Sequence, residues 1–378
     1  MKWGKLLRRS GALFLATLAL WWLMITSDLG AARSRLMAAA DLRAPSVTAA
    51  PAKLNGWVRL LMNQSPYLQA GYVLRGSSPG SQAGDQPTPS ASPSPSPSAA
   101  SEDEPIPSPA AGSENIVAQT FRPTGSPAYS SAQGVFVYNR THLALDMEQL
   151  AKTPVVLTGN GKGPQILIVH THATESYTQG GQDVYEESDP YRTTDDAHNV
   201  VRVGDEMAAA FAQAGLNVLH DRTLHDYPSY NGAYGRSHTT VEEYLAAYPS
   251  ISIVLDVHRD ALSGDDGTVY KAVADQSILP GAAQIMLVVG SNESNSAHTD
   301  WKKNLAFAIS LERTLNQEAP TLARPITLRS SSYNQQLSVG SLLVEVGTHG
   351  NSLQEATTAA RLFAQTAAPY FLEILPKS

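Results

Sequence analysis

Four consecutive aliphatic residues, Ile166-Leu167-Ile168-Val169, run directly into the polar sequence His170-Thr171-His172-Ala173-Thr174-Glu175. A short apolar run that follows Gly163-Pro164 is typical of a buried strand. Buried strands of this kind belong to α/β proteins, in which the functional site lies beyond the carboxyl ends of the strands. The two histidines and the glutamate therefore mark this strand end as a candidate site.

Similar apolar runs, separated by segments with helical periodicity, recur to the end of the chain. Further strands are predicted at Leu216–Leu219, Ile251–Val257, Ile285–Val289 and Leu342–Val346. Helical patterns lie at Asn199–Ala214, Trp301–Asn316 and Ser352–Leu372. Strands that alternate with helices predict an α/β domain with a mainly parallel sheet flanked by helices. This domain is predicted over residues 114–378, with a core of about residues 163–374.

The start of the chain has the composition of a membrane anchor. An uncharged, mostly apolar run from Ser10 to Ser27 follows a cluster of Lys and Arg and is just long enough for a spanning helix. Basic residues stay on the cytoplasmic side, so residues 1–30 predict a cytoplasmic stub and a single signal-anchor helix. The alternative is a cleaved signal peptide, with Ala38-Ala39-Ala40 as the small-residue site.

Two segments of different composition connect this anchor to the domain. Residues 31–76 are mixed and predict a juxtamembrane region. Residues 77–113 are rich in Pro and Ser and bury too little apolar area to fold, so a disordered and rather extended linker is expected. The domain at its end is then extracytoplasmic.

Charge and cysteine content exclude several classes of function. A net charge of −7 argues against a nucleic-acid partner, because binding a phosphate backbone needs a basic face. The chain has no cysteine, which removes disulfides, thiolate zinc sites and cysteine nucleophiles. Any metal must therefore be held by His, Asp or Glu.

Three of the predicted strands end in, or contain, reactive polar groups. His170, His172 and Glu175 follow the first, His258 closes the strand at Ile251–Val257, and Glu345 lies in the last. Catalytic zinc usually takes three His or carboxylate ligands and keeps one position for water. A carboxylate outside the metal shell can then accept a proton from that water. The sequence supplies such a set; the alternatives are hydrogen-bonded structural histidines and a salt bridge from Glu345 to Arg259 or Arg329.

Five motifs, in order along the chain, resemble the stage II sporulation protein P family. They are His170–Tyr177, His225–Tyr234, Leu255–Asp260, Tyr333–Ser338 and Leu343–Asn351. The last also resembles the glutamate-containing motif of zinc N-acetylmuramoyl-L-alanine amidases. Together the motifs span roughly residues 141–372, and the anchor, linker and C-terminal domain match the layout of that family.

The resemblance implies a peptidoglycan hydrolase of sporulation with Zn²⁺ as cofactor. Such a protein cleaves the N-acetylmuramoyl-L-alanine amide bond, and stem-peptide crosslinks as well, during engulfment. It implies a single-pass protein of the engulfing mother-cell membrane that works with stage II sporulation proteins D and M. Two rival functions are a non-catalytic cell-wall-binding scaffold and a protein metallopeptidase, although the chain has no His-Glu-x-x-His motif.

The resemblance also implies roles for individual residues. His258 and His172 are the implied histidine ligands, with His170 as the alternative to His172, and Glu345 is the implied general base. The amidases place a ligand Glu at the start of the following helix, where Thr194–Asn199 here has none. Glu175 is taken as the substitute. The alternatives to it are Asp195, Asp196 and His198.

Other residues of the motifs are candidates for charge stabilisation and substrate binding near the metal. Arg259 either stabilises developing charge or pairs with Asp256 or Asp260. The remaining candidates are assigned to substrate binding and are Tyr230, Asn231, Asn334 and Gln335.

Overall fold

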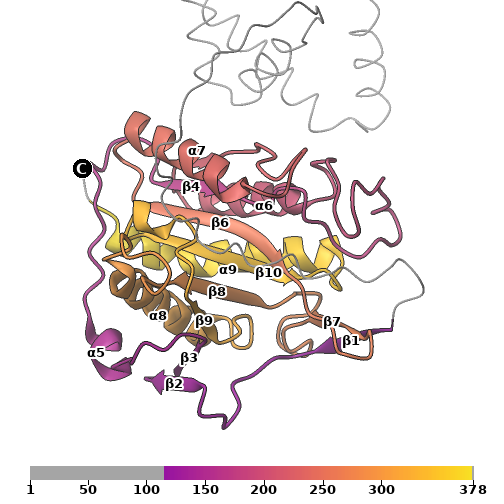
Figure 1. Cartoon of the computed structure of the whole chain (residues 1–378), viewed down its shortest axis with the longest axis horizontal. Coiled ribbons are helices and arrows are strands. Elements are labelled where there is room, and N and C mark those ends of the chain that lie inside the picture. Colours follow the sequence, from indigo (N-terminus) through magenta and orange to yellow (C-terminus); the bar gives the residue numbers. More distant parts are fainter. Residues whose placement is uncertain (1–114, 377–378) are drawn as a thin grey trace, which may run out of the picture. The chain divides into compact units, whose positions relative to one another are not determined.

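An eight-stranded sheet in the order β2-β3-β9-β8-β10-β6-β4-β5 runs through the centre of the domain (Figure 1). This computed structural model describes residues 115–376. The predicted anchor, juxtamembrane region and linker at residues 1–30, 31–76 and 77–113 lie outside the described residues. None of the helices within residues 115–376 combines the length and apolar character needed to cross a bilayer.

Most of the expected elements form close to their predicted bounds. The strands of the large sheet are β2 (Tyr129–Ala132), β3 (Val135–Asn139), β4 (Ile166–Val169), β5 (Val218–His220), β6 (Ile253–Asp260), β8 (Ile285–Gly290), β9 (Ile326–Arg329) and β10 (Ser341–Thr348). A separate two-stranded sheet pairs β1 (Ile116–Gln119) with β7 (Val269–Ala272). The helices are α5 (Met147–Lys152), α6 (Val200–Gln213), α7 (Ala233–Ala247), α8 (Trp301–Glu318), the 3₁₀ helix η1 (Gln335–Leu337) and α9 (Leu353–Ile374).

The α/β architecture is confirmed, but the sheet is mixed. Strands β5, β4, β6 and β10 run parallel to one another, whereas β10 pairs with β8 in the antiparallel sense. Strands β8, β9 and β3 share that opposite direction, and β2 is antiparallel to β3. A strand buried on both faces has the same apolar composition in either direction, so the sequence did not reveal the reversal. Because β4, β6 and β10 remain parallel, their carboxyl ends meet at one edge.

Three helices cover one face of the sheet and form the main core with it. Helices α6, α8 and α9 contribute the aromatic side chains Phe211, Phe307, Phe363 and Phe371, all fully buried. Helix α9 begins with a capping box, in which the Ser352 hydroxyl and the Glu355 carboxylate each accept a backbone N–H of the first turn. Truncating one of these phenylalanines to Ala typically costs about 3–5 kcal/mol.

The opposite face of β6 carries the charged residues of the predicted site. Ile253, Leu255 and Val257 point to the main core, and Val254 packs on the other side against Val241 of α7. Alternation then places Asp256, His258 and Asp260 on the same side as Val254. The sheet thus separates an apolar face under three helices from a face that holds the polar groups.

Glu312 is a buried carboxyl in α8 whose ionisation should limit stability. Its Oε2 has no hydrogen-bond partner, and burial raises its pKa well above the ordinary value of 4.5. A folded state that prefers the neutral acid loses stability as pH rises above the pKa of the unfolded chain. Glu312→Gln should therefore gain stability relative to wild type between about pH 5 and about pH 8, by up to about 1.4 kcal/mol per pH unit.

Thermal unfolding, monitored by circular dichroism at about pH 5 and about pH 8, measures the difference in stability between Glu312→Gln and wild type. The matched control is Glu318→Gln, at an exposed position of the same helix. A gain for Glu312→Gln that is the same at both pH values would contradict a buried neutral carboxyl.

Candidate metal centre

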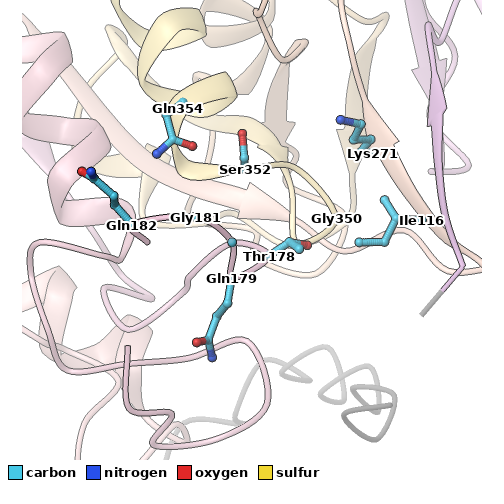
Figure 2. A pocket seen from close by; sticks show the side chains of 10 residues that line it. Ile116, Thr178, Gln179, Gly181, Gln182, Lys271, Gly350, Ser352 and Gln354 are labelled. Carbon is cyan, nitrogen blue, oxygen red and sulfur yellow. The ribbon is translucent and has the colours of Figure 1, made fainter. Parts of the chain in front are cut away.

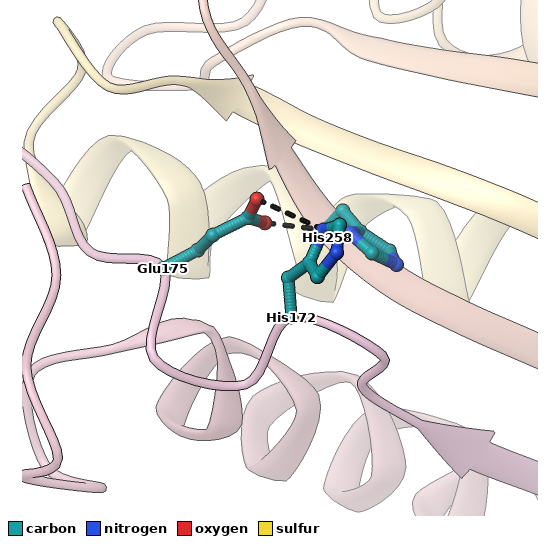
Figure 3. A group of neighbouring side chains, drawn as sticks. All are labelled: His172, Glu175 and His258. Atoms are coloured by element: carbon teal, nitrogen blue, oxygen red, sulfur yellow. Dashed lines mark ion pairs between the residues drawn. The ribbon is translucent and has the colours of Figure 1, made fainter. Parts of the chain in front are cut away.

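His172, Glu175 and His258 come together at the carboxyl edge of the sheet. One ligand atom from each lies within 4.8 Å of the others. Glu175 Oε1 is 3.5 Å from His172 Nδ1, and Glu175 Oε2 is 3.4 Å from His258 Nδ1. Figure 3 shows the Glu175 carboxylate directed at the two imidazole rings, one from the turn after β4 and one from β6.

These three side chains fit a zinc ion in chemistry and in spacing. Two imidazoles and one carboxylate are a usual protein donor set for catalytic zinc, with the fourth position left to water. Bond lengths of about 2.0–2.1 Å in a tetrahedron separate neighbouring ligand atoms by about 3.3 Å. The separations of 3.5 Å from Oε1 to His172 and 3.4 Å from Oε2 to His258 are close to that value, and one ligand atom from each of the three residues lies within 4.8 Å of the others.

Asp256 orients both histidine-bearing segments. Its carboxylate accepts the Thr171 backbone N–H at 2.8 Å and the Thr171 hydroxyl at 2.7 Å. The same Oδ1 atom lies 3.0 Å from His258 Nε2. A carboxylate at Nε2 favours a proton there, which leaves Nδ1, the nitrogen beside Glu175, as the atom that a cation would bind.

The charges of the group are strongly coupled. Burial opposes charge on Glu175, but contacts with His172 and His258 hold its pKa well below the ordinary value. Burial also opposes charge on His258, but Asp256 and Glu175 raise its pKa well above 6.5. The carboxylates therefore keep a proton on His258 that an incoming cation has to displace.

Arg192 and Asp226 brace the turn that carries Glu175. Arg192 Nη2 is 3.5 Å from Glu175 Oε1, and its Nη1 donates to Asp226 at 2.7 Å. Asp226 also accepts the Thr174 hydroxyl at 2.6 Å and the Thr174 backbone N–H at 3.1 Å. The guanidinium lies over the ring of Tyr230, 4.9 Å from its centroid.

Sequence reasoning missed both bracing residues. Arg192 lies in the irregular segment between β4 and α6, where no periodicity marks a residue as important. Asp226 lies next to His225 in the motif His225–Tyr234. Its side chain is almost completely buried, and the sequence alone does not show this burial.

His170 is not brought into this group. Its Nδ1 donates to the Val257 carbonyl at 2.7 Å, and its Nε2 is 2.8 Å from His220 Nε2. A Cβ atom at Gly204 would lie 2.6 Å from both of these Nε2 atoms, so a glycine is required there. Both ring nitrogens of His170 are thus occupied by protein, and it is His172 rather than its alternative His170 that lies in the group.

The alternatives to Glu175 also lie apart from the group. Asp195 Oδ2 is 2.8 Å from His198 Nδ1, and Asp196 faces Arg222 at 3.7 Å. Asp195 accepts the Ala197 backbone N–H as well, so these residues organise the entry to α6.

Glu345 lies directly beside His258 on the neighbouring strand. The two residues are register partners in the parallel pair of β10 and β6, so their side chains leave the same face of the sheet. Glu345 Oε2 is buried without a hydrogen-bond partner. Burial and the nearby charge of Asp260 raise the pKa of Glu345 to about 8. A carboxyl with this pKa can exchange a proton near neutral pH.

Arg259 is committed to the backbone around the site rather than to Asp256 or Asp260. Its side chain donates to the carbonyls of Ser176 and Tyr191 at 2.9 and 3.0 Å. Its backbone N–H donates to Glu175 Oε2 at 3.1 Å. Arg259 thus fixes the loop that presents Glu175.

The four candidate substrate-binding residues separate into different environments. The ring of Tyr230 stacks on His172 with centroids 4.5 Å apart, whereas Asn231 is exposed. Asn334 donates to the Tyr234 carbonyl at 2.9 Å. Gln335 is buried and bonds the backbone of Gly290 and Val288, each at 2.9 Å. Among the contacts described within residues 115–376, Tyr230 is the only one of these four residues that touches the His172–Glu175–His258 group.

Metal affinity should rise with pH because binding displaces a proton. His258 must lose its proton before Nδ1 can bind a cation, and its pKa is raised well above 6.5. Below that raised pKa the apparent affinity for Zn²⁺ should increase about tenfold per pH unit for each proton released. Titration calorimetry of the full-length chain in two buffers of different ionisation enthalpy measures the affinity and the protons released. Affinity independent of pH between about pH 6 and about pH 8 would contradict the prediction.

Substitution of Arg192 or Asp226 should weaken metal binding, although neither residue is a metal ligand. We expect Asp226→Asn and Arg192→Gln each to lower the affinity for Zn²⁺ by about 10–100-fold, because partners of ligand side chains fix their orientation. Competition with a chromogenic chelator measures the change. The control is Arg361→Gln, since Arg361 forms an exposed ion pair with Glu206 at 2.7 Å away from this group. An affinity equal to wild type in both variants would rule out the bracing role.

Comparison with known proteins places these features in a family. The family model for stage II sporulation protein P matches residues 61–368. The stage II sporulation protein P of Bacillus subtilis (strain 168) is 28% identical over 224 residues, which are 56% of this chain and 51% of that protein. The chain therefore spans about half the length of this curated relative.

Two solved structures also share similarity with the chain. The N-acetylmuramoyl-L-alanine amidase AmiC2 of Nostoc punctiforme is 15% identical with a TM-score of 0.33, covering 56% of this chain and 99% of that one. The CwlD amidase from Clostridioides difficile, solved in complex with the GerS lipoprotein, is 11% identical with a TM-score of 0.35 and the same coverage. Since the family model covers well over half of the sequence, this chain belongs to the stage II sporulation protein P family.

Proposed function

We propose that this chain is a zinc-dependent peptidoglycan hydrolase of sporulation that cleaves the N-acetylmuramoyl-L-alanine amide bond, and stem-peptide crosslinks as well. The observation that carries the proposal is the His172–Glu175–His258 group with Glu345 beside it on the next strand. Membership of the stage II sporulation protein P family supports a substrate in the cell wall.

In this function the residues of the site have two roles, metal binding and proton transfer. His172, Glu175 and His258 would hold the zinc ion, which supplies a bound water of lowered pKa and polarises the scissile carbonyl. Glu345 accepts the proton of the attacking water and delivers it to the leaving amine nitrogen. A pKa of about 8 suits this exchange, since a catalytic acid and base works best near the ambient pH.

Aromatic side chains enclose the His172 side of the site. Tyr230 stacks on the imidazole, and Tyr234 meets it edge-on with centroids 5.4 Å apart. Apolar ring faces lower the local dielectric and strengthen the charge interactions inside the site. We assign Tyr230 to substrate contact as well, because its ring is partly exposed beside the metal ligands.

We further propose that residues 1–30 anchor the protein in the engulfing mother-cell membrane by a single helix, with the domain on the extracytoplasmic side. The apolar run from Ser10 to Ser27 and the Pro/Ser-rich residues 77–113 support this arrangement. The linker would let the domain reach a wall substrate away from the membrane. Stage II sporulation proteins D and M are the proposed partners, on the strength of the family alone.

Two substitutions separate metal binding from turnover. His258→Ala should lose both zinc binding and hydrolysis, because a ligand is removed. Glu345→Gln should keep zinc binding but lower kcat by at least about 100-fold, because the proton acceptor is lost. The full-length chain is incubated with purified peptidoglycan, and the released ends are identified by mass spectrometry with and without chelator.

Each outcome of this experiment has a clear meaning. Intact stem peptides released by wild type support the amidase, and crosslink cleavage supports the endopeptidase activity. Full activity after rigorous removal of metal would exclude the zinc mechanism. Binding to the wall without any released product, in all preparations, would favour the non-catalytic scaffold instead.

A further inference from the structure

A chain of hydrogen bonds runs from helix α6 to strand β6 through two histidine rings. The Asp205 carboxylate on α6 lies 3.1 Å from His220 Nδ1, and His220 Nε2 lies 2.8 Å from His170 Nε2. His170 Nδ1 in turn is 2.7 Å from the Val257 carbonyl. Since His220 closes β5 and His170 follows β4, four elements of the fold meet in these three contacts.

The last contact of this chain joins the two segments that carry the histidine ligands. Backbone pairing of β4 with β6 ends one residue before Val257. The His170 side chain donates to the Val257 carbonyl in place of a further strand residue. Val257 directly precedes His258, and His170 lies two residues before His172. The contact therefore sets the spacing of the strand ends beside both ligands.

The donors and acceptors of the chain fix where its protons lie. The Val257 carbonyl can only accept, so a neutral His170 carries its proton on Nδ1 and presents an acceptor at Nε2. His220 must then donate through Nε2 to His170. It must also donate through Nδ1 to the carboxylate of Asp205. Both nitrogens of His220 are thus protonated, and its ring is an imidazolium.

The surroundings of the two rings place the positive charge on His220 rather than on His170. His170 is fully buried, whereas the His220 side chain is 10% exposed and adjoins a carboxylate. Burial opposes charge on Asp205, but the hydrogen bond from His220 and the nearby charge of Arg222 lower the pKa of Asp205. A largely buried cation is stable beside such an anion.

The pair of rings is closed to ligands and offers little room for water. A Cβ atom at Gly204 would lie 2.6 Å from both Nε2 atoms, so α6 rests directly on the two rings. The cavity of about 620 Å³ between residues 178–182 and the start of α9 is lined by other residues (Figure 2). Because no water takes the place of His220, the tautomer of His170 depends on the contact between the rings.

We propose that His220 is a positioning residue, which fixes the tautomer of His170 and thereby the strand ends that carry the two histidine ligands. Without the donor at His220, His170 is free to carry its proton on Nε2. Its Nδ1 lone pair would then face the Val257 carbonyl, and two acceptors in contact repel each other. The inference rests on the proposed function, which names the metal ligands.

The zinc affinity of the full-length chain tests the positioning role. His220→Phe keeps a ring but removes both nitrogens, and we expect it to lower the affinity for Zn²⁺ by about 10–100-fold, because the ligands lose an orienting partner. His220→Gln should retain most of the affinity, since its amide N–H can donate to His170 Nε2. Competition with a chromogenic chelator measures both variants. The control His142→Phe changes a fully exposed side chain beyond β3 and should equal wild type.

NMR of the ring nitrogens in the full-length, metal-free chain, labelled at histidine, needs neither zinc nor turnover. Wild type should show His170 with its proton on Nδ1 and His220 with protons on both nitrogens. His220→Gln should keep that tautomer of His170. In His220→Phe the Nε2–H tautomer of His170 should appear, because its partner is lost.

The two measurements separate this inference from the proposed function. A wild-type His170 protonated on Nε2, a singly protonated His220, or an equal loss of zinc affinity in both His220 variants would overturn the positioning role. A wild type that binds no zinc would count against the proposed function, and the tautomer of His170 in the three chains would still decide the inference.

Discussion

The contact of Asp256 with Thr171 and His258 holds the candidate centre together. One carboxylate on β6 accepts two hydrogen bonds from the residue next to His172, and the same carboxylate faces the imidazole of His258. Two segments that are distant in sequence are thereby fixed at one carboxyl edge. A change at Asp256 would release the turn and the imidazole at once, so its effect cannot be divided between the two histidines.

The same face of the sheet concentrates acidic groups, and each is neutralised in a different way. Asp256 accepts two hydrogen bonds from Thr171 and lies 3.0 Å from the His258 imidazole, whose positive charge it favours. Asp260 forms an ion pair with Arg324 at 2.8 Å. Glu345 has no such partner at Oε2 and responds to burial by a raised pKa. Glu345 thus keeps a proton to exchange, and it is the register partner of the ligand His258 on the neighbouring strand.

Much of this arrangement could be predicted from sequence, because β4, β6 and β10 are apolar runs that end in, or contain, polar residues. His172, Glu175 and His258 follow from that pattern and from the family motifs. The direction of β8 did not follow, since apolar composition carries no information about strand sense. Nor did the position of His170, because its contacts with the Val257 carbonyl and with His220 are made between segments distant in sequence. The role of Arg192 did not follow either, because its side chain contacts Glu175 and Asp226 through tertiary interactions that no local pattern specifies.

The position of β10 in the sheet has a consequence for the order in which the domain is built. It comes after all other strands described within residues 115–376, yet it lies between β6 and β8 in the middle of the sheet. A chain stalled or truncated before Ser341 lacks Glu345 and leaves two long central strands with unpaired edges, which invite aggregation. Completion of the central sheet and placement of Glu345 beside His258 therefore depend on the same strand and coincide.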